Sequence, residues 1–184
     1  MDVIAIAISL ISLAVAGVGT ALANKRAKEA IAESRKAAAS ALWSGVQEAI
    51  QRMIGFDPAS EPIGERLANL RIAMIALVDE MPDWVGLDKW LEAERALGAV
   101  LGREVLERAK RGNTVDERLQ ILDPYQLWAQ ALGSNLRHFR AAGYDALAAA
   151  KLRALAESHM KQISERNGWP PPPTATAGIR ALDA

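Results

Sequence analysis

The chain has 184 residues, 51% of them hydrophobic and 24% charged, and its 22 basic and 22 acidic side chains give a formal net charge of zero. Nucleic-acid binding needs a basic excess on one face, so we predict no nucleic-acid partner. The sequence contains no cysteine, which excludes disulfides, thiolate metal sites and a cysteine nucleophile.

The first element is an uncharged run over residues 3–23. A helix rises about 1.5 Å per residue, so the run has about the length needed to cross a hydrocarbon core of roughly 30 Å. We therefore predict a transmembrane helix over 3–23. One alternative is a cleaved secretory signal, because residues 21–23 have the small-x-small form of a cleavage site, but the start Met1-Asp2 lacks a basic n-region. The other alternative, a buried core helix, suits shorter runs.

Basic residues follow this run and none precedes it: Lys25, Arg26, Lys28, Arg35 and Lys36. Cytoplasmic flanks of membrane spans carry an excess of lysine and arginine, so the predicted topology has the N-terminus outside and the C-terminal domain in the cytoplasm. The same cations could meet anionic lipid headgroups. A topology signal alone explains them equally well, so both interpretations stay open.

Small residues recur along one face of the predicted span at steps of three and four: Ala5, Ser9, Ser12, Ala16, Gly19 and Ala23. In lipid, small residues allow helix backbones to approach closely. The face therefore predicts a packing surface for a second copy or for another membrane protein. The alternative is that small residues are simply common in transmembrane helices.

The helix is expected to continue through a juxtamembrane segment, 24–55, because residues 24–54 contain no proline and only one glycine. A narrow apolar stripe runs along this segment and needs a packing partner. Its members are Ile31, Ala38, Leu42, Val46, Ala49 and Met53.

A helical bundle is predicted over 60–168. Two prolines in 55–62 break the first helix, and a seam at steps of three and four predicts a second helix from near Pro62 to Met81. The seam residues are Ile63, Leu67, Leu70, Met74, Leu77 and Met81. A third helix reaches Arg111 and turns Trp90, Leu97, Leu101 and Val105 inward. Gly98 and Gly102 on it would permit another helix to cross closely.

The sequence Thr114-Val-Asp-Glu117 has the form of a capping box and predicts a short fourth helix, which Asp123-Pro124 should end. A fifth helix carries an apolar stripe, and a sixth runs from near Tyr144 to Arg166, with Asn167-Gly168 as its cap. The stripe comprises Tyr125, Trp128, Leu132, Leu136 and Phe139. Residues 169–184 are predicted to be a Pro-rich disordered tail, either a plain linker or a docking ligand.

The fold class is therefore all-α: an N-terminal transmembrane helix continuing into a juxtamembrane helix, followed by a small cytosolic helical bundle. An Ala- and Arg-rich composition with a short N-terminal anchor resembles the layout of uncharacterised small single-pass membrane proteins of high-GC actinobacteria. The resemblance covers the whole chain as a layout, without a shared motif. It implies location in a bacterial plasma (inner) membrane.

Catalytic motifs are absent from the sequence: it has only two histidines and no P-loop, dinucleotide fingerprint, H-E-x-x-H or G-x-S-x-G. We predict no catalytic, metal or cofactor site. Paired acids such as Glu92-Glu94 and Glu104-Glu107 are assigned to solvated helix faces. The remaining ligand-site candidates are Arg137, His138, Arg140 and His159, although His138 also suits a helix C-terminus and His159 a hydrogen-bonded core position.

Two functions follow from these features. The first is a membrane-anchored interaction or scaffold protein, which contacts the lipid bilayer and either forms a homo-oligomer or pairs with another membrane protein. The alternative is a membrane-tethered enzyme or small-ligand sensor. It requires the four candidates to meet in one pocket.

Overall fold

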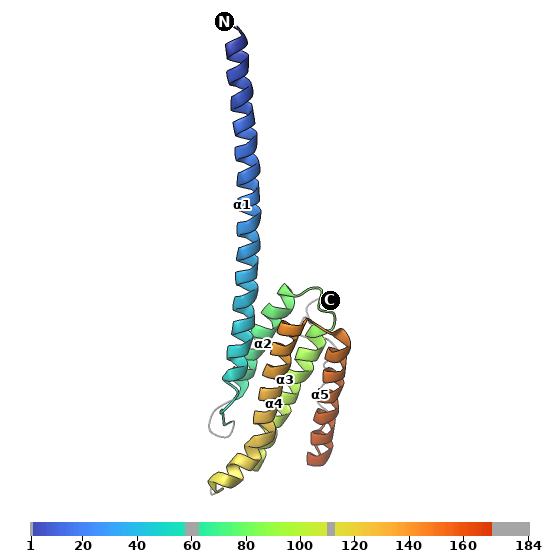
Figure 1. Ribbon diagram of the computed structural model, residues 1–184. Coiled ribbons are helices and arrows are strands. Elements are labelled where there is room, and N and C mark those ends of the chain that lie inside the picture. Colours follow the sequence, from blue (N-terminus) through green and yellow to red (C-terminus); the bar gives the residue numbers. More distant parts are fainter. Residues whose placement is uncertain (1, 58–62, 110–112, 171–184) are drawn as a thin grey trace. The chain divides into compact units, whose positions relative to one another are not determined.

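The structure is a computed structural model that describes residues 2–57, 63–109 and 113–170, with side chains from Lys25 onward except at position 35. In this part of the chain every regular element is a helix, which confirms the predicted all-α class (Figure 1). The helices are α1 (Asp2–Gln51), α2 (Ile63–Glu80), α3 (Leu87–Arg108), α4 (Val115–Ala142) and α5 (Ala146–Asn167).

The chain divides into two compact units, Met1–Ala41 and Leu42–Ala184. In the first unit, the side chains described between Lys25 and Ala38 are all exposed, and Ile31 exposes 55% of its surface. No helix among the residues searched is long and apolar enough to cross a membrane. The side chains of residues 1–24 lie outside the described part, and the predicted span over 3–23 with its small-residue face stays a prediction.

The second unit begins within α1, at Leu42, whereas the sequence places the start of the bundle at residue 60. The last turns of α1 and the segment after them bury five large apolar side chains in the common core: Trp43, Val46, Ile50, Met53 and Phe56. The bundle is thus the packing partner of the C-terminal part of the apolar stripe, from Leu42 to Met53. The N-terminal part, at Ile31 and Ala38, is exposed.

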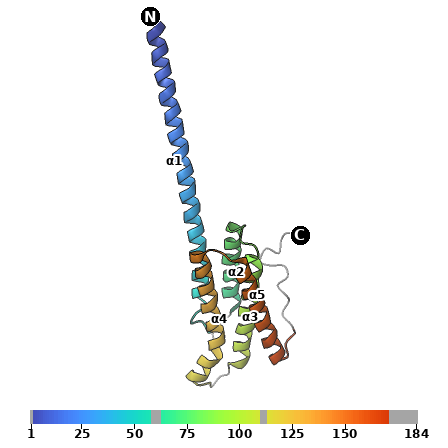
Figure 2. The same cartoon turned by 45° about the vertical axis from the view of Figure 1, so that its right-hand side comes forward.

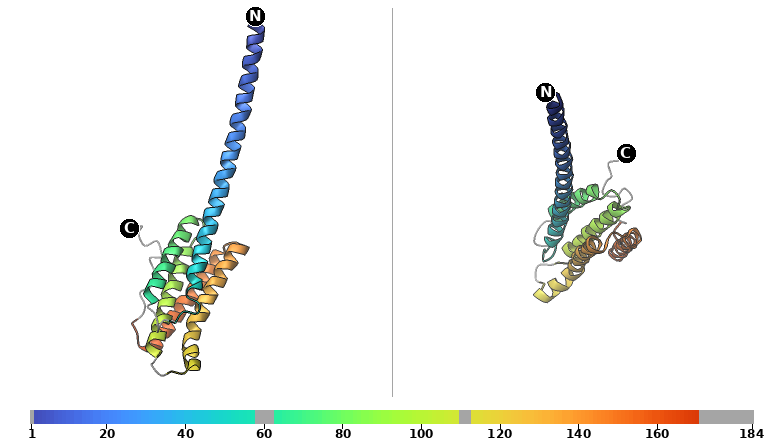
Figure 3. Two further views of the ribbon diagram at one scale, coloured as in Figure 1. Left: turned by 90° about the vertical axis from the view of Figure 1, so that its left-hand side faces the viewer. Right: turned by 45° about the horizontal axis from the view of Figure 1, so that its top comes forward.

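α3 is the central helix of this unit. It packs against α2, α4 and α5, and the right-hand view of Figure 3 shows it between α2 and α5. The predicted inward residues of the third helix are buried, as is the predicted stripe of α4 from Tyr125 to Phe139. Each fully buried large apolar side chain contributes roughly 1.5–3 kcal/mol relative to an exposed one. The seam of α2 is buried from Leu67 to Leu77, while Ile63 and Met81 are partly buried.

Pro124 lies inside α4, so the predicted break at this position is wrong. A proline removes one backbone hydrogen bond and crowds the preceding turn, which bends a helix without necessarily ending it. Figures 1 and 2 show the first turns of α4 at an angle to the rest. The helix continues because Tyr125 and Trp128, just after the proline, are buried in the core.

The helix ends follow local chemistry. Thr114 and Glu117 form the predicted capping box at the start of α4. α5 begins at Ala146, two residues later than expected, because the Asp145 side chain accepts hydrogen bonds from the backbone N–H groups of the first turn. Gly168 takes the left-handed conformation after α5, with φ 64°, which confirms the predicted cap. Most of the predicted tail, 171–184, lies outside the described residues.

The two glycines of α3 accommodate side chains rather than the backbone of a crossing helix. A Cβ atom at Gly98 would lie 2.2 Å from Cη2 of the Trp128 indole, and one at Gly102 would lie 2.2 Å from Cδ1 of Ile63. Gly98 therefore lets the large, rigid Trp128 ring rest directly on α3. The predicted close helix crossing is corrected to close seating of side chains from α4 and α2.

Candidate ligand-binding site

An open cleft is lined by residues of α4 and α5, together with residues of α3, against which both helices pack. The cleft has a volume of about 530 Å³ and is hereafter called the α4/α5 cleft. α3 contributes Leu97 and Leu101. The volume falls within the range of roughly 300–1,000 Å³ that is usual for small-molecule sites.

The walls of the α4/α5 cleft are largely apolar. Leu127 and Ala131 come from α4, and Leu152 and Leu155 come from α5. Leu127 and Leu155 expose 55% and 56% of their surfaces, respectively. Both leucines line the cleft and neither packs fully into the core, which leaves apolar surface available to a ligand.

Glu94 lines this cleft, and its carboxyl group joins two buried tryptophans. Trp90 Nε1 donates to Glu94 Oε1 at 2.9 Å, and Trp128 Nε1 donates to Glu94 Oε2 at 3.0 Å. Burial raises the pKa of Glu94, while the two indole hydrogen bonds partly oppose this rise. Because Trp128 belongs to α4, the carboxyl fastens α4 to α3.

A charged group occupies the end of the cleft near the C-termini of α3 and α5. Glu104 Oε1 accepts from Arg166 Nη2 at 2.7 Å and lies 3.8 Å from Arg108 Nη1. Asn167 Nδ2 donates to the same oxygen at 3.4 Å. Two guanidinium groups against one carboxylate leave this end with a positive charge. Glu104 also fastens α5 to α3.

The burial of Glu94 and Glu104 was not predicted from the sequence. Glu94 and Glu104 expose only 7% and 6% of their surfaces, so their assignment to solvated faces is wrong. The spacing contained a signal: Glu94 follows Trp90 by four residues and precedes Leu97 by three, which places it on the apolar stripe of α3. A buried glutamate on such a stripe needs polar partners, and two indole N–H groups supply them.

The four sequence-predicted candidates separate into two places. His159 lines the α4/α5 cleft, and Arg137, His138 and Arg140 do not line it. Arg137 Nη1 donates to Gln47 Oε1 at 3.3 Å, and the Arg140 guanidinium lies 5.9 Å from the centroid of the Trp43 ring. Both therefore contact the end of α1 within the second unit.

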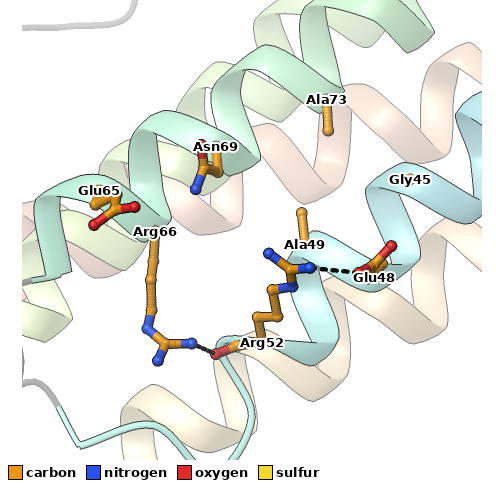
Figure 4. Close-up of a pocket in the computed structure, with 8 residues that line it drawn as sticks. All are labelled: Gly45, Glu48, Ala49, Arg52, Glu65, Arg66, Asn69 and Ala73. Carbon is orange, nitrogen blue, oxygen red and sulfur yellow. Dashed lines mark hydrogen bonds and ion pairs between the residues drawn. The ribbon is translucent and has the colours of Figure 1, made fainter.

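A second cleft, of about 590 Å³, lies between the last turns of α1 and α2 (Figure 4). Arg52 pairs with Glu48 at 2.6 Å, and Arg66 donates to the backbone carbonyl of Arg52 at 2.7 Å. Glu48 and Arg52 are exposed and Arg66 is half-buried, and all three engage neighbouring protein groups. This cleft offers a ligand less buried apolar surface than the α4/α5 cleft.

Metal-binding clusters of three or more His, Cys, Asp or Glu side chains do not occur among the residues that the structure describes. The α4/α5 cleft thus offers apolar walls, a buried carboxyl, a histidine and an arginine-rich end.

The amino-acid sequence matches no family model, no curated protein and no solved structure.

Proposed function

We propose that the protein is a single-pass membrane-anchored helical interaction protein whose bundle binds a ligand. The observation that carries the binding role is the α4/α5 cleft, where Leu127 and Leu155 remain more than half exposed. Clefts lined by apolar side chains with a few polar groups are the usual form of ligand sites. Its polar groups would orient the ligand.

The anchoring role rests on the sequence. The uncharged run over 3–23, followed at once by Lys25, Arg26 and Lys28, supports insertion with the N-terminus outside and the bundle in the cytoplasm. The resemblance in layout favours a bacterial plasma membrane. The small-residue face of 3–23 would pack against a second copy or another membrane protein.

A pair of single-cysteine variants tests the packing face, since the native chain has no cysteine. Ser12→Cys lies on the small-residue face, whereas Val15→Cys lies outside it. Oxidation in native membranes should give disulfide-linked dimers with Ser12→Cys only. Equal or absent cross-linking in both variants would remove the homotypic interface.

The binding role is tested by filling the cleft. Ala131→Trp places a large ring between α4 and α5, and the matched control Ser134→Trp changes an exposed residue of α4 that does not line the cleft. The full chain is extracted with its surrounding lipid in polymer nanodiscs, and the co-purified small molecules are identified by mass spectrometry. A compound retained by the wild type and the control, but not by Ala131→Trp, is expected. Identical profiles in all three would refute the binding role.

A tethered enzyme is the second candidate, favoured by the placement of His159 in the cleft. It has less support because the cleft contains only one of the four residues on which that function depends. His159→Ala should leave ligand retention nearly intact if the histidine has no chemical role.

A further inference from the structure

The α4/α5 cleft has a volume and polarity that restrict its ligand. Three turns of an α-helix, about 16 Å long and 10 Å across, occupy more than about 1,200 Å³. The cleft has about 530 Å³, so a helix could rest on its rim without entering it. A cavity of 150 Å³ holds one benzene ring, so this volume corresponds to roughly 20 carbon atoms.

The length of the cleft agrees with a single hydrocarbon chain. Its α5 wall runs from Leu152 to Arg166, a distance of about 21 Å along the helix axis. An acyl chain in one leaflet of a bilayer spans about 15 Å, half of the hydrocarbon core. A chain of that length would fit along the leucine walls and place its head at one end.

Charge decides which head group fits. The end of the cleft near the C-termini of α3 and α5 carries Arg108 and Arg166 against a single buried carboxylate, Glu104. A guanidinium has five N–H donors, so each arginine has donors beyond the one directed at Glu104. An anionic head would gain charge-assisted hydrogen bonds there, whereas a cationic head would meet repulsion.

We infer that the α4/α5 cleft binds a single-chain amphiphile with an anionic head, with the acyl chain along Leu97, Leu127 and Leu155 and the head at Arg108 and Arg166. A free fatty acid and a monoacyl phosphate share this chemistry. The inference rests on the proposed binding role of the cleft and names the chemical class of its ligand. The predicted membrane anchor would keep the cleft close to the source of such lipids.

The test uses the full chain in phosphatidylcholine nanodiscs and a palmitate carrying a photoreactive diazirine in mid-chain. After illumination, mass spectrometry locates the labelled residues. We expect saturable labelling of α4 near Leu127 and α5 near Leu155. Unlabelled palmitate or monoacyl phosphate should suppress it, and the stronger competitor identifies the source of the head group. Hexadecanol and hexadecyltrimethylammonium should compete at least several-fold less well.

Two variant pairs locate the chain and the head. Ala131→Trp should reduce cleft labelling at least about tenfold by occupying the space, and Ser134→Trp should leave it unchanged. Arg108→Gln should weaken palmitate binding about two- to fivefold, as expected for a partly exposed charge pair, and leave competition by hexadecanol unchanged. Lys161→Gln, an exposed charge change on α5 outside the cleft, is its control.

The labelling outcomes separate the amphiphile-binding inference from the proposed membrane anchor. Label on 3–23 without label in the cleft would overturn the inference and leave the anchor standing. Label in the cleft without label on 3–23 would support the inference and overturn the anchor. Equal competition by the alcohol, the ammonium and the acids would overturn the anionic assignment. A partner protein that covers the cleft would block every probe and would also overturn it.

Discussion

Replacement of Glu94 by glutamine tests whether its carboxyl fastens α4 to α3. Both carboxyl oxygens accept an indole N–H, from Trp90 and from Trp128. Glutamine has one carbonyl oxygen and one NH₂ group, so one of the two buried indoles would face a donor. A buried donor left without an acceptor costs about 1–3 kcal/mol. We expect Glu94→Gln to destabilise the fold by that amount.

The assay is thermal unfolding of the full chain in nanodiscs, followed by near-ultraviolet circular dichroism. For a chain of this size, each kcal/mol corresponds to a change in Tm of about 2–4 °C. Trp128→Phe removes the second donor, so Glu94→Gln should cost about 1–2 kcal/mol less in that background. The control Glu107→Gln, on the exposed face of α3, should change Tm little.

The pH dependence gives a second readout. The folded-state pKa of Glu94 is raised by burial, so its favourable contribution is fully present below its ordinary value of 4.5 and is lost as pH rises through the folded pKa. The cost of Glu94→Gln should therefore be largest below pH 4.5 and shrink at higher pH. A cost that is equal in both tryptophan backgrounds would refute the fastening role, and a cost that is constant with pH would refute the raised pKa of the buried carboxyl.

Three further predictions use the same unfolding measurement. Gly98→Ala should destabilise by about 1–3 kcal/mol because its Cβ would overlap the Trp128 ring, whereas Gly64→Ala, with open space around it, should be neutral or slightly stabilising; equal effects would contradict the seating of Trp128. Ile50→Ala should cost about 2–5 kcal/mol and Ile31→Ala less than about 0.5, because Ile50 is 2% and Ile31 55% exposed on the same helix; similar costs would place the start of the bundle elsewhere. Tyr144→Phe should cost about 0.5–1.5 kcal/mol because Tyr144 Oη donates to the Val85 carbonyl at 2.8 Å, and an unchanged Tm would show that the bond contributes nothing.

The helices could be predicted because their signals are local. Steps of three and four marked the seams of α2 and α4, and the capping box at Thr114 marked a helix start. The predicted break at Pro124 was wrong because only the free-energy cost of a proline within a helix can be read from the local sequence. The burial of Tyr125 and Trp128, which offsets this cost, comes from the tertiary fold. The start of the bundle at Leu42 was missed for a related reason: proline-free sequence predicts a continuous helix but not which of its turns are covered.

The α4/α5 cleft could not be predicted from the sequence, because it depends on which helices do not contact one another in the folded bundle. Histidines and arginines drew attention as chemically versatile residues, yet only His159 lies in the cleft. Glu94 and Glu104 resembled solvated acids, since pairs of acidic residues on a helix usually are. Their burial follows from the stripe that they share with Trp90 and Leu97, and from partners on α4 and α5 that are distant in sequence.

The two buried glutamates explain why the cleft exists. Glu94 holds α4 through Trp128, and Glu104 holds α5 through Arg166. Each helix is thus attached to α3 by its own glutamate side chain, and α4 and α5 need no contact with each other. Apolar side chains alone would favour closure, since collapse of α5 onto α4 would bury Leu127 and Leu155. Directional bonds to α3 oppose that movement, so the residues that stabilise the bundle also limit how closely α4 and α5 approach across the cleft.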